Sequence, residues 1–199
     1  MTNWCMTRIQ IRHEDKNKLA EFKEIIENCT KQNLAENGFG PKWLGNIVLH
    51  EGLGTISENI STDVKCRGSL VDMYLDAADG LIVDTETAWL PCLNLWSKLL
   101  EKYLPDAELI YIADEPGCDL FITNDPDYVD KYYLDVFEDV NGLESNWEIP
   151  EVELISLLKE LLQSECDSLD ELMELLDDSD YGECIRIHKW EYACAEDYD

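Results

Sequence analysis

The segment spanning residues 85–117 constrains the fold more than any other part of this 199-residue chain. It begins with a strand end, turns at Trp89-Leu-Pro91, continues as an amphipathic helix and returns as an apolar strand that ends at Glu115-Pro-Gly117. Pro91 suits a helix start, because the N–H that proline lacks has no partner in the first turn. The apolar face of this helix consists of Cys92, Leu93, Trp96, Leu99, Leu100 and Tyr103. The segment predicts a helix packed on the corner of a sheet.

The sequence around this segment predicts an α+β fold. The predicted elements are, in order, a strand at 4–12, a helix at 14–35, a hairpin of strands at 70–75 and 81–85, the helix at 92–103 and a strand at 109–113. Residues 42–53 fit either a short strand or a helical turn. The order is that of a ferredoxin-like split βαβ unit, which predicts an antiparallel sheet with helices on one face.

The remaining sequence predicts a second part of different character. Strands at 118–123 and 132–137 extend the first domain as a meander, so we expect a ferredoxin-like domain over residues 1–140. Residues 141–199 are expected to form an acidic α-rich extension that packs on the first domain. Its helices begin near Pro150 and at the Ser168-Leu-Asp-Glu171 capping box. A short strand at 184–192 ends it.

Composition limits the class of protein. Hydrophobic residues make up 45% of the chain, which is enough for a buried core and excludes general disorder. No apolar run approaches the ~20 residues that span a bilayer, and no secretory signal is visible at the N-terminus. The eight cysteines include no Cys-x-x-Cys pair, so we expect reduced thiols in a cytoplasmic protein. The oligomeric state stays open.

The net charge of −29 is unevenly distributed. Residues 1–100 have a balance of −4, whereas residues 101–199 have a balance of −25. Such a field repels nucleic acid and membranes and attracts basic proteins. We therefore expect no direct nucleic-acid or membrane binding, and a basic protein partner.

No motif predicts catalysis, a metal or a cofactor. The acidic run from Asp177 to Gly182 fails as a calcium loop, since His188 stands where the twelfth-position Glu is needed. The three histidines are far apart and no Gly-x-Ser-x-Gly elbow occurs. Acidic pairs such as Asp84 with Glu86 suit general acid–base chemistry only if they line a cleft, and 44 acidic residues supply many such pairs by chance. The sequence predicts a protein that is not an enzyme.

Several short motifs together carry a family resemblance. They are Asn3-Trp4-Cys5, Lys42-Trp43, Thr87-Ala-Trp-x-Pro91, and Tyr111 followed by Glu115-Pro-Gly117. In this order they resemble the YubB ferredoxin-like family of plasmid, phage and other mobile-element proteins, over residues 1–138. The chain departs from the family pattern at Thr2, at Cys92 and in the segment that follows Gly117. The resemblance implies a ferredoxin-like fold and a mobile-element origin.

The residues of these motifs allow two interpretations. They either form the scaffold of the fold or line the rim of a pocket whose floor is made of tryptophans. A further alternative is that Lys42 and Glu115 only pair with each other. The candidate pocket residues are Asn3, Trp4, Lys42, Trp43, Thr87, Trp89 and Glu115. A small-molecule or nucleotide-binding module is the function that such a pocket implies.

The charge distribution favours another function. Rows of carboxylates imitate the phosphates of nucleic acid, and Coulomb steering accelerates docking on a basic groove. We therefore expect a non-enzymatic accessory protein that inhibits a nucleic-acid-binding host defence protein, of the anti-CRISPR or anti-restriction type. The alternative is that the charge only confers solubility. The predicted contact residues are Glu165, Asp167, Asp170, Glu171, Glu174, Asp177, Asp178 and Asp180.

Overall fold

The computed structural model describes residues 3–35, 39–57, 60–61 and 64–195, in a mixed α+β fold with five α-helices among these residues. The chain forms two compact units. The first, unit 1, contains the residues up to Asn124 together with those from Ala193 onward, and unit 2 spans Asp125–Tyr192. In the part of the chain that the structure describes, no helix combines the length and the apolar character that crossing a membrane requires.

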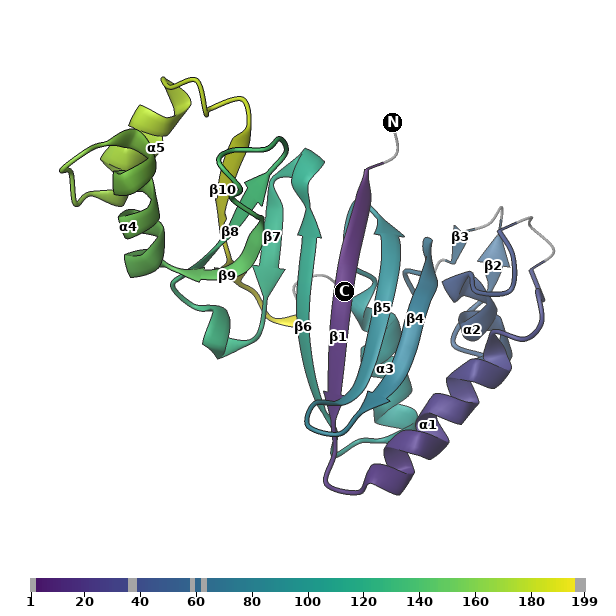
Figure 1. The fold of residues 1–199 in the computed structure, drawn as a ribbon. Coiled ribbons are helices and arrows are strands. Elements are labelled where there is room, and N and C mark those ends of the chain that lie inside the picture. The colour runs from purple at the N-terminus through teal and green to yellow at the C-terminus, as the bar shows by residue number, and fades with distance from the viewer. Residues whose placement is uncertain (1–2, 36–38, 58–59, 62–63, 196–199) are drawn as a thin grey trace. The chain divides into compact units, whose positions relative to one another are not determined.

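Unit 1 is built on an antiparallel sheet. Its strands are β1 (Trp4–Arg12), β4 (Gly68–Asp76), β5 (Gly80–Ala88), β6 (Glu108–Glu115) and β7 (Leu120–Thr123). They are hydrogen-bonded in the order β7-β6-β1-β5-β4, so the N-terminal strand β1 is central (Figure 1). The two-residue strands β2 (Ile56–Ser57) and β3 (Ile60–Ser61) pair separately. A 3₁₀ turn, Pro116–Cys118, joins β6 to β7.

Three helices cover one face of this sheet. They are α1 (Lys16–Cys29), α2 (Leu44–Glu51) and α3 (Leu93–Tyr103). Alternate residues of β1 are buried, among them Ile9 and Ile11, and they join the helices in one core with Phe22 and Trp96. This alternation is the one that a strand with one covered face requires. Helices on one face of an antiparallel sheet were predicted from the sequence.

Within the ambiguous residues 42–53, Leu44–Glu51 form helix α2. Buried residues run consecutively from Leu44 to Val48, a pattern that suits a helix packed on several sides. The buried Asn46 side chain accepts a hydrogen bond from the N–H of Ala35 at 3.1 Å and donates to the carbonyl of Gly40 at 3.0 Å. Tertiary packing around Asn46 therefore selected the helix.

Unit 2 has its own sheet and core. Its strands β8 (Lys131–Val136), β9 (Asn146–Pro150) and β10 (Ile185–Lys189) are hydrogen-bonded in the order β10-β8-β9. Two helices, α4 (Glu151–Leu162) and α5 (Leu169–Asp177), lie on one face of this sheet (Figure 1). A 3₁₀ turn (Pro126–Tyr128) precedes β8, and β11 (Glu191–Tyr192) comes directly before the residues that return to unit 1. The core of unit 2 includes Tyr132, Leu134, Ile149, Leu154, Leu158, Leu172, Leu176 and Ile185.

The expected meander and domain boundary differ from the structure. The strand predicted at 132–137 pairs with β9 and β10 in the sheet of unit 2 rather than continuing β6 and β7. The division between the units consequently lies at Asn124, not near residue 140. The strand predicted at 184–192 is interrupted at Trp190, between β10 and β11. Sequence alternation identified the strands but carried no information about their partners.

Candidate functional site

The eight predicted contact residues, together the acidic face, lie in unit 2 on α5 and in the segments directly before and after it. All eight side chains are exposed: Glu165, Asp167, Asp170, Glu171, Glu174, Asp177, Asp178 and Asp180. Residues 125–192 carry 21 acidic and four basic side chains, a formal balance of −17. The acidic face therefore belongs to a unit that is strongly acidic as a whole.

Helix α5 orders part of this face. Its buried residues Leu169, Leu172 and Leu176 fix which side of the helix points into the core. At 3.6 residues per turn, the acids from Asp170 to Asp178 then fall within about 120° of the helix circumference on the other side. The Ser168 hydroxyl accepts a hydrogen bond from the N–H of Glu171 and caps the helix as the sequence predicted.

The spacing of these carboxylates compares with that of a nucleic-acid strand. Asp170, Glu171, Glu174 and Asp177 span about 10.5 Å at 1.5 Å per residue. This amounts to one charge in about 3.5 Å, against one phosphate per ~3.4 Å along one strand of DNA. The linear charge density of α5 therefore approaches that of a single DNA strand.

Two of the acidic residues also have local partners. Lys159 at the end of α4 donates to Asp167 at 2.6 Å, and the Cys166 thiol donates to Glu171 at 3.1 Å. The hydrogen bond to Asp167 raises the pKa of Lys159, so this lysine stays charged. The Asp167 side chain is nevertheless 88% exposed, so the pair leaves its carboxylate open to a partner.

The motif residues at the end of the unit 1 sheet are only partly brought together. The carbonyl of Asn3 accepts from the N–H of Trp89 at 3.0 Å, and Thr87 lies opposite Cys5 in the pairing of β5 with β1. A Cβ built on Gly117 would lie 2.9 Å from a Glu115 oxygen and 3.0 Å from the Asn3 amide. Asn3, Thr87, Trp89 and Glu115 thus occupy one end of the sheet.

Lys42 and Trp43 lie instead beside the edge strand β4. The Lys42 ammonium donates to the carbonyl of Val71 at 2.8 Å, and Trp43 is buried with its ring over Gly45. Trp4 and Trp89 are each 46% exposed, so of the three tryptophans in the motifs only Trp43 is a core residue. Trp89 has a positive φ of 73°, which places it in the tight turn before α3 rather than in the core.

Glu115 is the chemically unusual member of this group. Its residue is 3% exposed, and its Oε2 atom finds no hydrogen-bond partner in the parts of the chain that the structure describes. The nearby Cys118 thiol has a raised pKa, since its hydrogen bond to Glu115 outweighs the one it receives from Asn3. Cys118 therefore stays a thiol at neutral pH and is a poor nucleophile.

A third group of polar residues was not predicted from the sequence. The Glu51 side chain, 5% exposed, accepts hydrogen bonds from two sides. Its Oε1 lies 3.4 Å from the Cys29 sulfur and 3.2 Å from Nδ1 of His50. Its Oε2 accepts from the Lys102 ammonium at 2.7 Å and from the hydroxyl of Tyr103.

This network fixes the protonation states. Burial opposes ionisation of Glu51, but the hydrogen bonds from Lys102, Tyr103 and His50 outweigh it and lower the pKa to about 2. Burial, and then the hydrogen bond to Glu51, raises the pKa of the Cys29 thiol to about 12. At neutral pH the group therefore holds a carboxylate and a neutral thiol.

Sequence spacing could not reveal this group, because its members come from three helices. Cys29 is the last residue of α1, His50 and Glu51 end α2, and Lys102 and Tyr103 end α3. The one local signal is the His50-Glu51 dipeptide just before Gly52. A dipeptide of this kind does not identify a site on its own.

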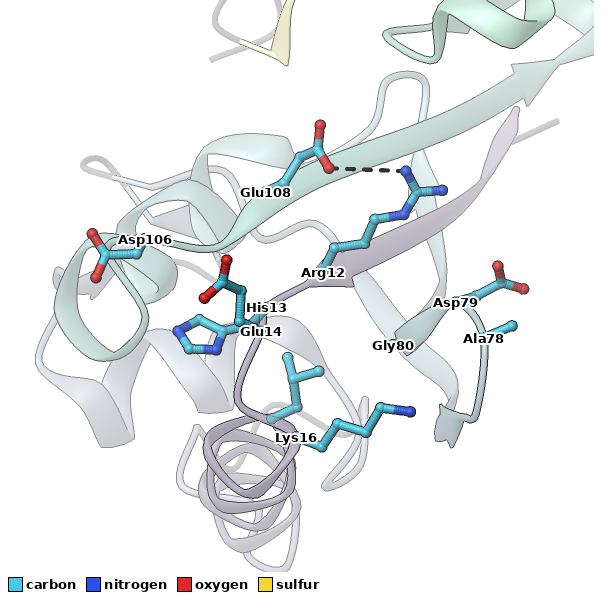
Figure 2. Close-up of a pocket in the computed structure, with 10 residues that line it drawn as sticks. Arg12, His13, Glu14, Lys16, Ala78, Asp79, Gly80, Asp106 and Glu108 are labelled. Carbon is cyan, nitrogen blue, oxygen red and sulfur yellow. Dashed lines mark ion pairs between the residues drawn. The ribbon is translucent and has the colours of Figure 1, made fainter.

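A polar depression lies where β1 ends and where β5 and β6 begin, at the opposite end of the unit 1 sheet from Glu115. Its volume is about 420 Å³. Figure 2 shows Arg12 facing Glu108. Their charged atoms are 3.8 Å apart, and the Lys16 ammonium donates a hydrogen bond to the carbonyl of Ala77 at 2.7 Å. The other lining residues are His13, Glu14, Leu19, Ala78, Asp79, Gly80 and Asp106. The lining mixes acidic and basic groups and selects no single class of ligand.

No protein-family model, curated protein or solved structure matches this chain.

Proposed function

We propose that this protein is a non-enzymatic inhibitor that presents the acidic face of unit 2 to a basic nucleic-acid-binding surface. The proposed partner is a host defence nucleoprotein of the CRISPR or restriction type, bound in the cytoplasm in place of its nucleic acid. The observation that carries the proposal is the exposure of all eight carboxylates, four of which follow one another along α5 at about 3.5 Å per charge. An exposed row of acids on a −17 unit attracts a basic groove at long range.

A ferredoxin-like topology for unit 1 is part of the proposal. What supports it is the strand order β6-β1-β5-β4, with α1 in the connection from β1 to β4, which also contains α2, β2 and β3, and with α3 between β5 and β6. Membership of the YubB ferredoxin-like family and a mobile-element origin rest on the sequence motifs of this unit. In this proposal, unit 2 is an acidic module joined to unit 1, a ferredoxin-like domain of mobile-element origin.

The test measures DNA binding by two purified enzymes in the presence of the full chain. One enzyme is a guide-loaded CRISPR nuclease and the other a restriction endonuclease. We expect inhibition of at least one, weakening strongly between about 50 and 200 mM salt. Inhibition that is independent of salt, or no inhibition of either enzyme, contradicts the proposal.

A charge-neutral variant locates the surface. Asp170→Asn, Glu171→Gln, Glu174→Gln and Asp177→Asn are combined in one full-length chain. At about 0.5 kcal/mol per exposed ion pair, four lost pairs weaken inhibition by about 30-fold.

The matched control removes four exposed acids from unit 1. It combines Glu21→Gln, Glu24→Gln, Glu101→Gln and Asp106→Asn, and so changes the net charge equally. We expect this control to inhibit nearly as well as the wild type. Equal losses in the two variants would mean that net charge alone acts, which is the solubility alternative.

A second candidate function is a small-molecule or nucleotide-binding module at the Glu115 end of the unit 1 sheet. The buried Oε2 of Glu115 favours it, because buried polar atoms normally have a partner and a bound donor would supply one. Thermal-shift measurements with nucleotides and small amines test it on the full chain. A shift that Glu115→Gln removes and the charge-neutral variant keeps supports a pocket, and the absence of any shift rejects it.

A further inference from the structure

We propose that Cys29, His50 and Glu51 form a zinc site with three protein ligands and one position open to water. The three side chains offer one ligand atom each, and these atoms all lie within 4.8 Å of one another. The proposal is independent of the acidic face, since every ligand belongs to unit 1.

The distances at Glu51 fit tetrahedral coordination. A tetrahedral zinc with Zn–S of about 2.3 Å and Zn–N or Zn–O of about 2.0 Å separates sulfur from oxygen by about 3.5 Å and nitrogen from oxygen by about 3.3 Å. The corresponding separations are 3.4 Å from the Cys29 sulfur to Oε1 and 3.2 Å from Nδ1 of His50 to Oε1. The two separations from Glu51 are therefore already those of a zinc tetrahedron, and the Cys29 sulfur and the His50 nitrogen lie within 4.8 Å of each other.

The two carboxylate oxygens of Glu51 have different partners, as they do in a carboxylate that binds a metal through one oxygen. Oε1 faces Cys29 and His50, whereas Oε2 is held by Lys102 and Tyr103. Ligating carboxylates are commonly oriented by such outer hydrogen bonds. Glu51 can bind through Oε1 alone while its other oxygen keeps its present partners.

Helix geometry supports a cation at this place. The C-terminal ends of α1 and α2 supply the ligands, and the last turn of α3 supplies the two groups that hold Oε2. A helix C-terminus carries about half a negative charge, so converging C-termini stabilise a cation. The Lys102 ammonium already interacts with the negative end of α2, since it also donates a hydrogen bond to the backbone carbonyl of Glu51 at 3.2 Å.

The donor set selects the metal. Thiolate, imidazole and carboxylate together suit zinc, whereas magnesium and calcium prefer oxygen alone. On binding, the thiol proton of Cys29 leaves to solvent, and the thiolate and the carboxylate balance the two charges of the ion. The His50 side chain is 43% exposed, so water reaches the fourth position.

Cobalt reports on this site, because Co²⁺ replaces zinc and a thiolate–Co²⁺ bond gives a charge-transfer absorption band. Co²⁺ is added to the reduced full-length chain in excess magnesium, which occupies sites made of carboxylates alone. We expect one Co²⁺ per chain, a thiolate band and the intense visible bands of four-coordinate cobalt, all abolished by Zn²⁺. Binding without a thiolate band, or no binding, overturns the proposal.

Three variants assign the ligands. Cys29→Ser should abolish the thiolate band, and His50→Gln should weaken Co²⁺ binding at least about tenfold. Cys166→Ser is the matched control, since this thiol also donates to a carboxylate, that of Glu171. A band that survives Cys29→Ser or disappears in Cys166→Ser overturns the assignment. If the buried Cys29→Ser variant does not fold, the half-exposed His50 decides: unchanged binding in His50→Gln rejects the site.

Discussion

At the scale of single residues, Gly68 shows how one missing side chain permits the pairing of β4 with β5. Gly68 lies opposite Thr87, and a Cβ on it would stand 2.3 Å from the carbonyl oxygen of Glu86 and 2.6 Å from the Thr87 methyl. Neither neighbour can move easily, because one is backbone and the other is fully buried. The end of the sheet that carries Thr87 therefore depends on this glycine.

We expect Gly68→Ala to lower the free energy of unfolding by about 1–3 kcal/mol, the usual cost of overpacking. Urea denaturation measures it. Ser69→Ala, at the next position of the same strand and half-buried, is the control and should change stability by less than about 0.5 kcal/mol. Equal stability of the two variants contradicts the close approach.

Glu148 gives unit 2 a pH-dependent contact. The Tyr128 hydroxyl donates to this carboxylate at 2.6 Å and the Lys131 ammonium lies 3.3 Å away. The hydrogen bond from Tyr128 leads in lowering the pKa of Glu148 below its usual value, against partial burial. A lowered folded-state pKa contributes stability above the unfolded-state pKa, and that contribution is lost as the pH falls through the folded-state value.

We therefore expect Glu148→Gln to be less stable than the wild type at pH 7, by a margin that shrinks below about pH 4.5 as the wild-type carboxylate protonates. Thermal denaturation over a pH series measures this margin. Glu144→Gln removes an exposed charge nearby without removing the Tyr128 hydrogen bond, and serves as the control. A margin that is constant with pH would show that charge at Glu148 is irrelevant.

At the scale of elements, the two faces of α5 have separate tasks. Leu172 is fully buried in the core of unit 2, whereas Leu175 on the same helix is 47% exposed. The acidic residues occupy the remaining side. The apolar face therefore holds the helix in place, and the acidic face is available for binding.

We expect Leu172→Ala to cost about 2–5 kcal/mol, the range for leucine truncation in a core. Leu175→Ala, with the same change of volume and of helix propensity, should cost less than about 1 kcal/mol. Chemical denaturation of the two full-length variants tests the orientation of α5. Similar losses would mean that the acidic residues do not share one outward face.

At the scale of the whole molecule, the chain has two hydrophobic cores. One contains side chains of β1, β5 and α1 to α3, and the other contains those of β8 to β10, α4 and α5. Each core has its own sheet and its own helices. Units with separate cores can lose their structure separately.

Leu172→Ala should therefore speed hydrogen exchange in residues 125–192 and leave exchange in β1 and β5 at the wild-type rate. Exchange followed by mass spectrometry resolves the two regions. The reverse variant, Ile9→Ala in the unit 1 core, should give the opposite pattern. Loss of protection in both units from either variant would show that the chain unfolds as one cooperative body.

The sequence by itself determined the charge and much of the secondary structure. Periodicity predicted β1 from its alternation and α3 from its apolar face, and the capping box predicted the start of α5 at Ser168. The exposure of the acidic residues on α5 followed from the same periodicity, because a helix that buries Leu172 and Leu176 turns Asp170, Glu174 and Asp177 outward. These are local properties, and local sequence is sufficient for them.

Only the tertiary structure decided which elements are partners. It placed β8 in the sheet of unit 2, made residues 44–51 a helix and left Trp89 exposed, because strand pairing and burial depend on residues far away in the sequence. The polar group around Glu51 could not be predicted from the sequence for the same reason, because its members are far apart along the chain. Cys29 and Lys102 are 73 positions apart along the chain, and they meet at Glu51 only because three helices end at one place.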